Sequence, residues 1–315
     1  MKKVLFICGS LNQTTIMHKI SQHLSEFDCY FTPYYGDGLI KLLNNYGVLD
    51  FTVMGGRFRQ QTDDYLKREG VKIDYRGSSN DYDLVVTCQD LIIQKNIRKK
   101  KIVLVQEGMT DPENLIYRLV KRFKLPRYLA STAATGLSDA YDKFCVASEG
   151  YGELFMKKGV NPEKIVVTGI PNFDNALRYL DNSFPRKGYV LVGTSDTRET
   201  FKFDNRERFL KRVLSIARGR KLIFKLHPNE RIERSKREIK KHALDALVFS
   251  GGDINPMIAN CDVLITQYSS VAFIGLALGK EVHSYFDVEM LKKLLPIQNG
   301  GTSAKKIAAV CRGYL

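Results

Sequence analysis

The stretch that decides the fold, residues 261–273, reads CDVLITQYSSVAF. Its first half is a run of apolar and β-branched residues, which is typical of a strand buried on both faces of a parallel sheet. A short polar turn follows at residues 267–270, and an apolar helical pattern begins after Ser270. A buried strand that passes through a polar turn into a helix is the repeating unit of an α/β protein.

The same unit recurs along the whole chain. Apolar runs that predict strands lie at residues 4–8, 29–32, 51–54, 84–87, 102–105, 143–147, 165–168, 189–192, 222–225, 246–249, 263–266 and 281–284. Helical patterns lie at residues 14–26, 63–69, 113–124, 151–158, 205–218, 231–240, 270–278 and 302–312. The alternation predicts parallel sheets with right-handed crossovers, and so many strands exceed one comfortable open sheet.

The segment 180–188, LDNSFPRKG, combines turn formers with charge just before a new series of strands. We therefore predict two Rossmann-like, doubly wound domains that face each other across a cleft, residues 1–182 and 183–315. The last helical pattern is expected to be able to pack back on the first domain. Because ligands of open parallel sheets bind beyond the carboxyl ends of the strands, the informative residues are those that follow each strand.

Composition narrows the class of protein. The 315 residues are 44% hydrophobic, which is enough for a sizeable core, and lysine and arginine exceed aspartate and glutamate by 15. Such a positive field favours polyanions, anionic membranes or phosphorylated substrates. The six cysteines are scattered without a CxxC pair, and no apolar run approaches the ~20 residues of a membrane span. These features exclude secreted, fibrous and transmembrane proteins and predict a cytoplasmic location.

Three strand ends in the later half carry candidate phosphate ligands. His227 and Pro228 follow one strand, and an imidazole there can donate a hydrogen bond to a phosphate oxygen. Ser269 and Ser270 open a helix whose free amides favour an anion. Residues 193–199, GTSDTRE, offer the hydroxyls of Thr194 and Ser195 and the guanidinium of Arg198. For each feature taken alone, simple helix or turn capping remains the alternative.

In the earlier half, Glu107 and Gly108 follow the apolar run at residues 102–105. A carboxylate at a strand end can accept a proton, although a helix cap or an ion pair is an equally open interpretation. Gly9 and Ser10 follow the first strand, and their loop departs from G-x-G-x-x-G, which disfavours NAD and FAD. No metal-ligand pattern stands at a strand end, and we expect no metal or other cofactor.

The order strand, His-Pro, then CDVLITxYSS, a helix and Leu-Gly-Lys resembles the donor-binding half of GT-B glycosyltransferases. More closely, it resembles the CDP-glycerol glycerophosphotransferases and the capsule-type transferases that use CMP-linked sugars. The resemblance covers roughly the C-terminal third and implies that His227, Pro228, Ser269 and Ser270 hold the phosphate of the donor. Gln267 stands where the family usually has Asp.

This resemblance implies a metal-independent transfer of a glycosyl or polyol-phosphate group from a CMP- or CDP-linked donor to a carbohydrate hydroxyl. Surface polysaccharide or glycolipid synthesis is the expected context, with a carbohydrate or a lipid-linked carbohydrate as acceptor. Glu107 would take the proton of the acceptor, where the family often has His-Gly. Gly9, Ser10 and Gly108 would face the acceptor, while Thr194, Ser195 and Arg198 would assist phosphate binding.

Two alternatives stay open. Thr194, Arg198 and Glu199 match part of the Thr-x-His-Arg-Arg-Glu-Asn stretch of non-hydrolysing UDP-GlcNAc 2-epimerases, whose His-Val-Glu-Ala-Gly corresponds to the region of Glu107. Against such an epimerase, residues 267–270 replace the Asp-Ser-Gly-Gly that the resemblance would demand. The other alternative is a non-catalytic scaffold that binds a membrane or a polyanion through its charge.

Residues 113–127 combine an apolar stripe with basic residues. This pattern predicts a peripheral contact with an anionic membrane, for which the inner face of the cell membrane is the expected place. A helix packed on its sheet with a solvated basic face is the alternative. The other basic runs, at residues 98–101 and 231–241, lack any nucleic-acid-binding signature, so nucleic acid is not an expected partner.

Overall fold

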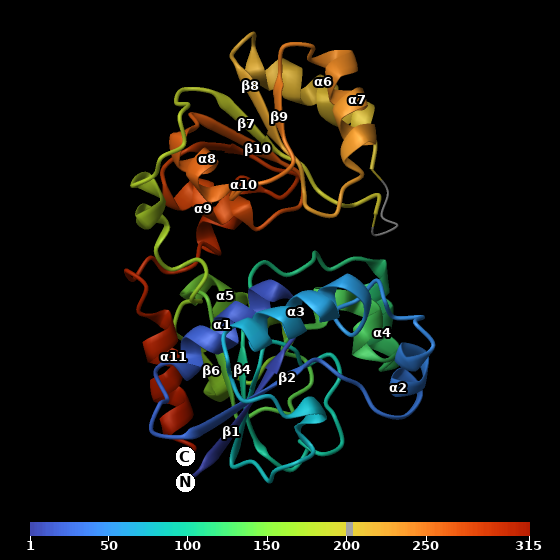
Figure 1. The fold of residues 1–315 in the computed structure, drawn as a ribbon, viewed down its shortest axis with the longest axis vertical. Coiled ribbons are helices and arrows are strands. Elements are labelled where there is room, and N and C mark those ends of the chain that lie inside the picture. The colour runs from blue at the N-terminus through green and yellow to red at the C-terminus, as the bar shows by residue number, and fades with distance from the viewer. Residues whose placement is uncertain (200–203) are drawn as a thin grey trace. The chain divides into compact units, whose positions relative to one another are not determined.

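The computed structural model describes residues 1–199 and 204–315. The chain forms two compact units, one made of Met1–Asp174 with Pro296–Leu315 and the other of Asn175–Leu295 (Figure 1). The domains predicted from the sequence, residues 1–182 and 183–315, stay a prediction.

The first unit contains a parallel sheet of six strands in the order β2-β1-β3-β4-β5-β6. Its strands are β1 (Lys3–Cys8), β2 (Asp28–Pro33), β3 (Leu84–Thr87), β4 (Lys101–Val105), β5 (Lys143–Val146) and β6 (Ile165–Val167). Its α-helices are α1 (Leu11–Ser21), α2 (Gly38–Asn45), α3 (Gly56–Arg68), α4 (Leu115–Phe123), α5 (Glu149–Lys158) and α11 (Ser303–Arg312). Three 3-10 helices complete it, η1 (Tyr75–Gly77), η2 (Arg127–Ala134) and η3 (Pro162–Lys164).

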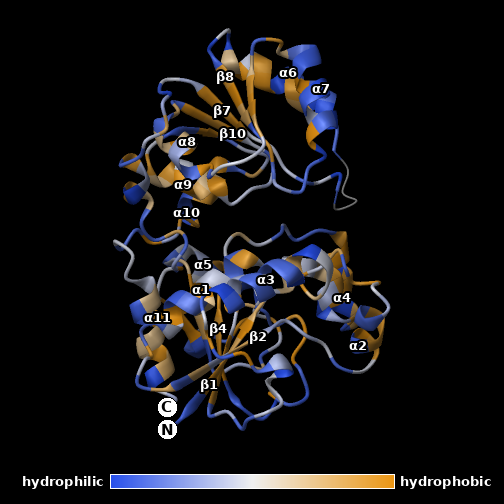
Figure 2. Cartoon of the chain, viewed as in Figure 1, coloured by the Kyte–Doolittle hydropathy of each residue, from blue (hydrophilic) through white to orange (hydrophobic). Residues whose placement is uncertain are grey.

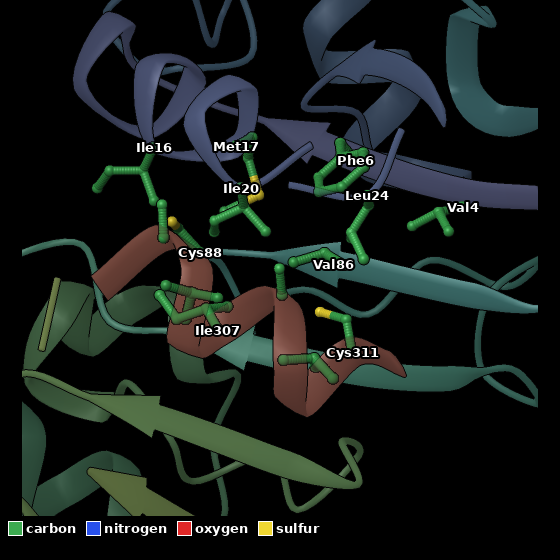
Figure 3. Close-up of a cluster of buried hydrophobic side chains, with 14 of the residues drawn as sticks. Val4, Phe6, Ile16, Met17, Ile20, Leu24, Val86, Cys88, Ile307 and Cys311 are labelled. Carbon is green, nitrogen blue, oxygen red and sulfur yellow. The ribbon is translucent and has the colours of Figure 1, made fainter. Parts of the chain in front are cut away.

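The core of the first unit lies between its central strands and the helices α1 and α11. Figure 3 shows side chains from these elements gathered in one cluster, among them Phe6 from β1, Ile16 and Met17 from α1, and Ile307 and Cys311 from α11. All five are buried. The last helix is therefore part of the first unit, because its apolar face closes this core.

The second unit contains a parallel sheet of five strands in the order β11-β10-β7-β8-β9. Its strands are β7 (Val190–Gly193), β8 (Leu222–Lys225), β9 (Leu247–Phe249), β10 (Val263–Thr266) and β11 (Glu281–His283). Its helices are α6 (Arg206–Ala217), α7 (Ile232–His242), α8 (Asn255–Asn260), α9 (Val271–Ala277), α10 (Val288–Lys293) and the 3-10 helix η4 (Ala176–Leu180). The direction of winding reverses between β7 and β10, and a reversal of this kind opens a crevice at the carboxyl ends of the two strands.

The predicted fold class is confirmed: both units are α/β, each with one parallel sheet. Figure 2 shows why the strands were readable, because apolar residues concentrate in them and polar residues on the outer faces of the helices. No helix within residues 1–199 and 204–315 has both the length and the apolar content needed to cross a bilayer.

The strand predicted at residues 51–54 is wrong. The structure has turns there, between α2 and α3. The Thr52 hydroxyl donates to the Leu49 carbonyl at 2.7 Å and accepts from the Met54 amide at 3.2 Å, and these local bonds compete with sheet pairing. Gly56 follows with a positive φ of 51°, which ends any extended run.

Candidate functional site

In the first unit, three side chains from the start of α1 converge on Glu107, which follows β4. The Ser10 hydroxyl and the Asn12 amide donate to Oε1 at 2.9 and 3.1 Å. The Gln13 amide donates to Oε2. All three donors are neutral, and no cation pairs with Glu107 among the described residues. The carboxylate is thus fixed in place while its charge stays uncompensated.

The first turn of α1 is built to present these donors. Ser10 is the N-cap of α1, and it exchanges bonds with Gln13 in a capping box. Gly9 makes room for this arrangement, because a Cβ at Gly9 would lie 1.7 Å from Oε1 of Gln13. Asn172 holds Asn12 from the other side through a 2.5 Å bond between Nδ2 and Oδ1.

The backbone after β4 is held by Gln106, whose amide is buried. Its Nε2 donates to the Gly108 carbonyl at 2.8 Å, and its Oε1 accepts from the Ala147 amide at 2.9 Å. These bonds fix the turn that carries Glu107. A carboxylate offers about four acceptor positions, of which the donors of α1 use three. Glu107 is half-buried and can accept one further proton or hydrogen bond.

In the second unit, a hydrogen bond joins the ends of β7 and β10, between which the direction of winding reverses. The Ser195 hydroxyl, after β7, donates to Oε1 of Gln267, after β10, at 2.7 Å. Nε2 of Gln267 donates to Oδ1 of Asp204 at 2.8 Å. Both ends of the Gln267 amide are therefore used. An aspartate at this position would bring a second negative charge to Asp204 and could not donate to it, which explains the departure from the Asp usual in the resembled families.

A second set of bonds joins β7 to β8. The Thr194 hydroxyl donates to Glu230 and accepts from the backbone amide of His227 at 3.1 Å. Oε2 of Glu230 also accepts from the His227 amide, at 3.0 Å. Thr194, Ser195, His227 and Gln267 thus form a continuous line of polar contacts across the ends of three adjacent strands.

Two ion pairs lie near this line, of which the pair of Arg206 with Glu230 is buried. Arg206, only 6% exposed, donates from Nη2 to Oε1 of Glu230 at 2.5 Å. Arg198 makes a bidentate pair with Glu238, with both bonds at 2.8 Å. This pairing raises the pKa of Arg198 and lowers the pKa of Glu238, because each charge stabilises the other through hydrogen bonds. Asp204 lies 3.5 Å from Nε of Arg198.

His227 is oriented by its neighbours. Its Nδ1 accepts from the Asn229 amide at 3.2 Å and lies 3.6 Å from the carboxylate of Asp196. In the neutral ring the proton therefore belongs to Nε2, which makes no hydrogen bond within the described residues. With its side chain 38% exposed, His227 can offer this N–H to a ligand. Pro228, beside it, is exposed at the turn.

Ser269 and Ser270 lie at the carboxyl end of β10, half-exposed, just before α9. The Ser269 hydroxyl accepts a 3.5 Å bond from the Val271 amide, whereas the Ser270 hydroxyl makes no hydrogen bond within the described residues. Because β7 separates β10 from β8, the serines and His227 lie on either side of Thr194, about 10 Å apart by the spacing of strands.

The structure thus brings Thr194, Ser195 and His227 into one bonded line, and places the two serines at its edge. Arg198 lies behind that line, in its pair with Glu238. Sequence reasoning missed Asp204, Arg206 and Glu230. Of these three, only Glu230 could have been found from the sequence. A glutamate three residues after His227 is at the right spacing to accept a hydrogen bond from the His227 backbone amide. Among the described residues, no group of three or more His, Cys, Asp or Glu side chains is placed to hold a metal ion.

No protein-family model and no curated protein matches the sequence. Solved structures match the fold over the whole chain. A UDP-GlcNAc 2-epimerase from Neisseria meningitidis bound to UDP-GlcNAc is 12% identical, with 99% of this chain and 100% of that chain covered and a TM-score of 0.61. MnaA from S. aureus with UDP is 13% identical, with 100% and 97% covered and a TM-score of 0.61. A UDP-GlcNAc 2-epimerase from Methanocaldococcus jannaschii is 13% identical, with 99% and 100% covered and a TM-score of 0.57.

These matches establish a GT-B-like fold and do not show the CDP-glycerol transferase family. The predicted transfer from a CMP- or CDP-linked donor to a carbohydrate hydroxyl is wrong, since the matching structures are consistently UDP-GlcNAc 2-epimerases. The prediction failed because it rested on a few strand-end residues in one third of the chain. The acceptor-facing roles of Gly9, Ser10 and Gly108 and the deprotonation of an acceptor by Glu107 were predicted for that reaction, and the matches do not test the residues themselves.

Proposed function

We propose that this chain binds a UDP-linked amino sugar and inverts its configuration at C2, as a non-hydrolysing UDP-sugar 2-epimerase. The observation that carries the proposal is the match of the entire chain to UDP-GlcNAc 2-epimerases, including structures bound to UDP-GlcNAc and to UDP. Partial resemblance at Thr194, Arg198 and Glu199 and at the strand end of Glu107 supports the same conclusion.

Glu107 is the proton carrier in this proposal. Inversion at C2 breaks the C2–H bond on one face of the sugar and forms a new one on the other. The Glu107 carboxylate is held by neutral donors and keeps one acceptor position that can take this proton. Among the described residues, no ion pair of Glu107 occupies that position. Ser10, Asn12 and Gln13 position the carboxylate.

The polar line of the second unit is the proposed diphosphate site. Because C1 of a nucleotide sugar is an acetal carbon, the C2 proton leaves most readily when its electron pair forms a C1=C2 bond and the nucleotide phosphate departs from C1. The epimer then forms when the same phosphate adds back to C1 and a proton adds to the opposite face of C2. The charge on that phosphate needs preorganised donors. Nε2–H of His227 and the hydroxyls of Ser269 and Ser270 supply them, and the buried pair of Glu230 with Arg206 holds Thr194 and the turn of His227 in place.

Nucleotide binding is tested by the thermal shift of the full chain with UDP, CDP, CMP and GDP. A ligand that binds only the folded state raises the melting temperature as its concentration rises above Kd. We expect the largest shift with UDP. His227→Ala should weaken UDP binding, while His242→Ala, at the end of α7, serves as the matched control. A shift with CDP or CMP that exceeds the shift with UDP contradicts the proposal.

The reaction is tested by incubating the protein with UDP-GlcNAc alone and following the sugar by NMR. We expect the C2 epimer to form without release of free sugar. Glu107→Gln should lower the rate by about 10²–10⁴-fold, the usual contribution of a general base or acid. Glu153→Gln, at an exposed position on α5, should leave the rate unchanged. Absence of the epimer at saturating UDP-GlcNAc overturns the proposed activity.

A further inference from the structure

Helix α4 turns most of its apolar side chains to solvent. Leu115 is 70% exposed and Phe123 65%, and Ile116 and Leu119 are exposed as well. The buried side of the helix is formed by other residues, chiefly Tyr117 and Val120, which pack against the alanines of η2. The apolar stripe that the sequence shows at residues 113–127 is therefore not the side that holds α4 on the unit.

The exposed apolar residues form one band along the helix. At about 100° per residue, Leu115, Leu119, Phe123 and Ile116 fall within roughly 100° of its circumference. Arg118 and Arg122 border this band on one side, and Lys124 follows at the end of the helix. Within residues 1–199 and 204–315, these three cations have no ion pair, so their charge is available to a partner.

The apolar exposure continues beyond α4. Leu125, Tyr128 and Leu129 are all more than two-fifths exposed. Helix α2 buries no residue, and its Leu39 and Leu42 are exposed. In Figure 1, α2 and α4 both lie at the side of the first unit opposite α11. We call Leu115, Ile116, Arg118, Leu119, Arg122 and Phe123 the α4 surface.

We propose that the α4 surface binds an anionic lipid bilayer, with the apolar band in the acyl boundary and the arginines at the phosphate level. An amphipathic helix with basic residues beside its apolar band is the arrangement that lies in a membrane interface. A second copy of this chain is the poorer occupant. A two-fold interface through this face would bring Arg118 and Arg122 against a partner surface of the same positive charge. The net charge of +15 acts in the same direction.

The test is cosedimentation of the full chain with two kinds of vesicle. One is phosphatidylcholine alone, and the other contains about 30–40% phosphatidylserine, which gives its surface a negative potential. We expect binding only to the anionic vesicles, weakened by salt. Arg118→Gln with Arg122→Gln should lower the partition coefficient by roughly 25-fold, about fivefold for each charge. Leu115→Ser with Phe123→Ser should lower it by at least about tenfold, because two apolar anchors no longer insert.

Matched controls lie in the second unit. Arg208→Gln with Arg237→Gln removes two exposed arginines, and Leu177→Ser with Leu244→Ser removes two exposed leucines. Both control pairs should bind anionic vesicles as the unaltered chain does. Equal losses in test and control pairs would assign binding to net charge and overturn the proposal. The proposal is also overturned if the unaltered chain does not bind anionic vesicles. It is overturned as well if the chain self-associates instead and Leu115→Ser with Phe123→Ser abolishes that self-association.

Discussion

The two units place polar residues at the same edge of similar sheets, yet they treat charge in opposite ways. In the first unit, Glu107 is held by neutral hydroxyl and amide donors. In the second unit, the carboxylates of Glu230 and Glu238 are matched by Arg206 and Arg198. In the proposed function, the first arrangement would keep an uncompensated charge for proton transfer. The second would use its charges as a support and leave hydroxyls and an imidazole for a ligand.

The largest effect on stability should come from breaking the buried pair of the second unit. Glu230→Gln leaves the guanidinium of Arg206 buried with reduced compensation, which typically costs about 3–5 kcal/mol. Urea denaturation followed by circular dichroism measures this loss. Glu233→Gln, whose side chain is 82% exposed, should change the free energy of unfolding by less than about 0.5 kcal/mol. If both variants lose the same amount of stability, the buried pair of Glu230 with Arg206 does not support the fold of the second unit.

A smaller loss is expected when the neutral cluster of the first unit is disturbed. In Gly9→Ala, the new Cβ displaces the Gln13 amide and removes its hydrogen bond to Glu107. Loss of a hydrogen bond to a charged group costs about 1.5–3 kcal/mol. Gly108→Ala is the control for denaturation, because its Cβ would lie at an ordinary 3.6 Å from Phe173. Equal stability of the two variants would show that Gln13 does not need the space at Gly9.

The smallest effect should appear in the pH dependence of the second unit. The pKa of Glu238 is lowered by its hydrogen bonds to Arg198, so the pair stabilises the folded state above the ordinary pKa of glutamate. That contribution disappears as the pH falls through the lowered pKa. Glu238→Gln should therefore cost about 1 kcal/mol at pH 7 and nothing once the pH lies below the lowered pKa of Glu238. A difference between variant and unaltered chain that persists in acid contradicts this pairing.

Much of the fold could be predicted from the sequence because parallel strands buried on both faces read as continuous apolar runs. Residues 51–54 are also largely apolar but lie in a turn, where the Thr52 hydroxyl bonds to the backbone of Leu49 and Met54. The exposed side of α4 was not predictable from its periodicity, since the same stripe suits a buried face. Only packing against η2 shows which side is covered.

The candidate site was predictable only where a residue stands directly after a strand. His227 and Thr194 were found in this way, and the structure joins them. Their supports, Arg206 and Asp204, were not found, because their partners lie 24 and 63 residues away and meet them only through the order of the strands. The activity was predicted wrongly for a related reason. The prediction relied on a few residues similar to one family, whereas the similarity in fold to the epimerases is not visible in the sequence at 12–13% identity.

The most direct test of the central claim is the exchange of the C2 hydrogen when UDP-GlcNAc is incubated with the protein in D₂O. We predict that one deuterium enters at C2 in the unaltered chain and that Glu107→Gln slows its entry by about 10²–10⁴-fold while UDP still binds. Exchange at an undiminished rate in Glu107→Gln, or no exchange in the unaltered chain, would contradict the role given to this carboxylate.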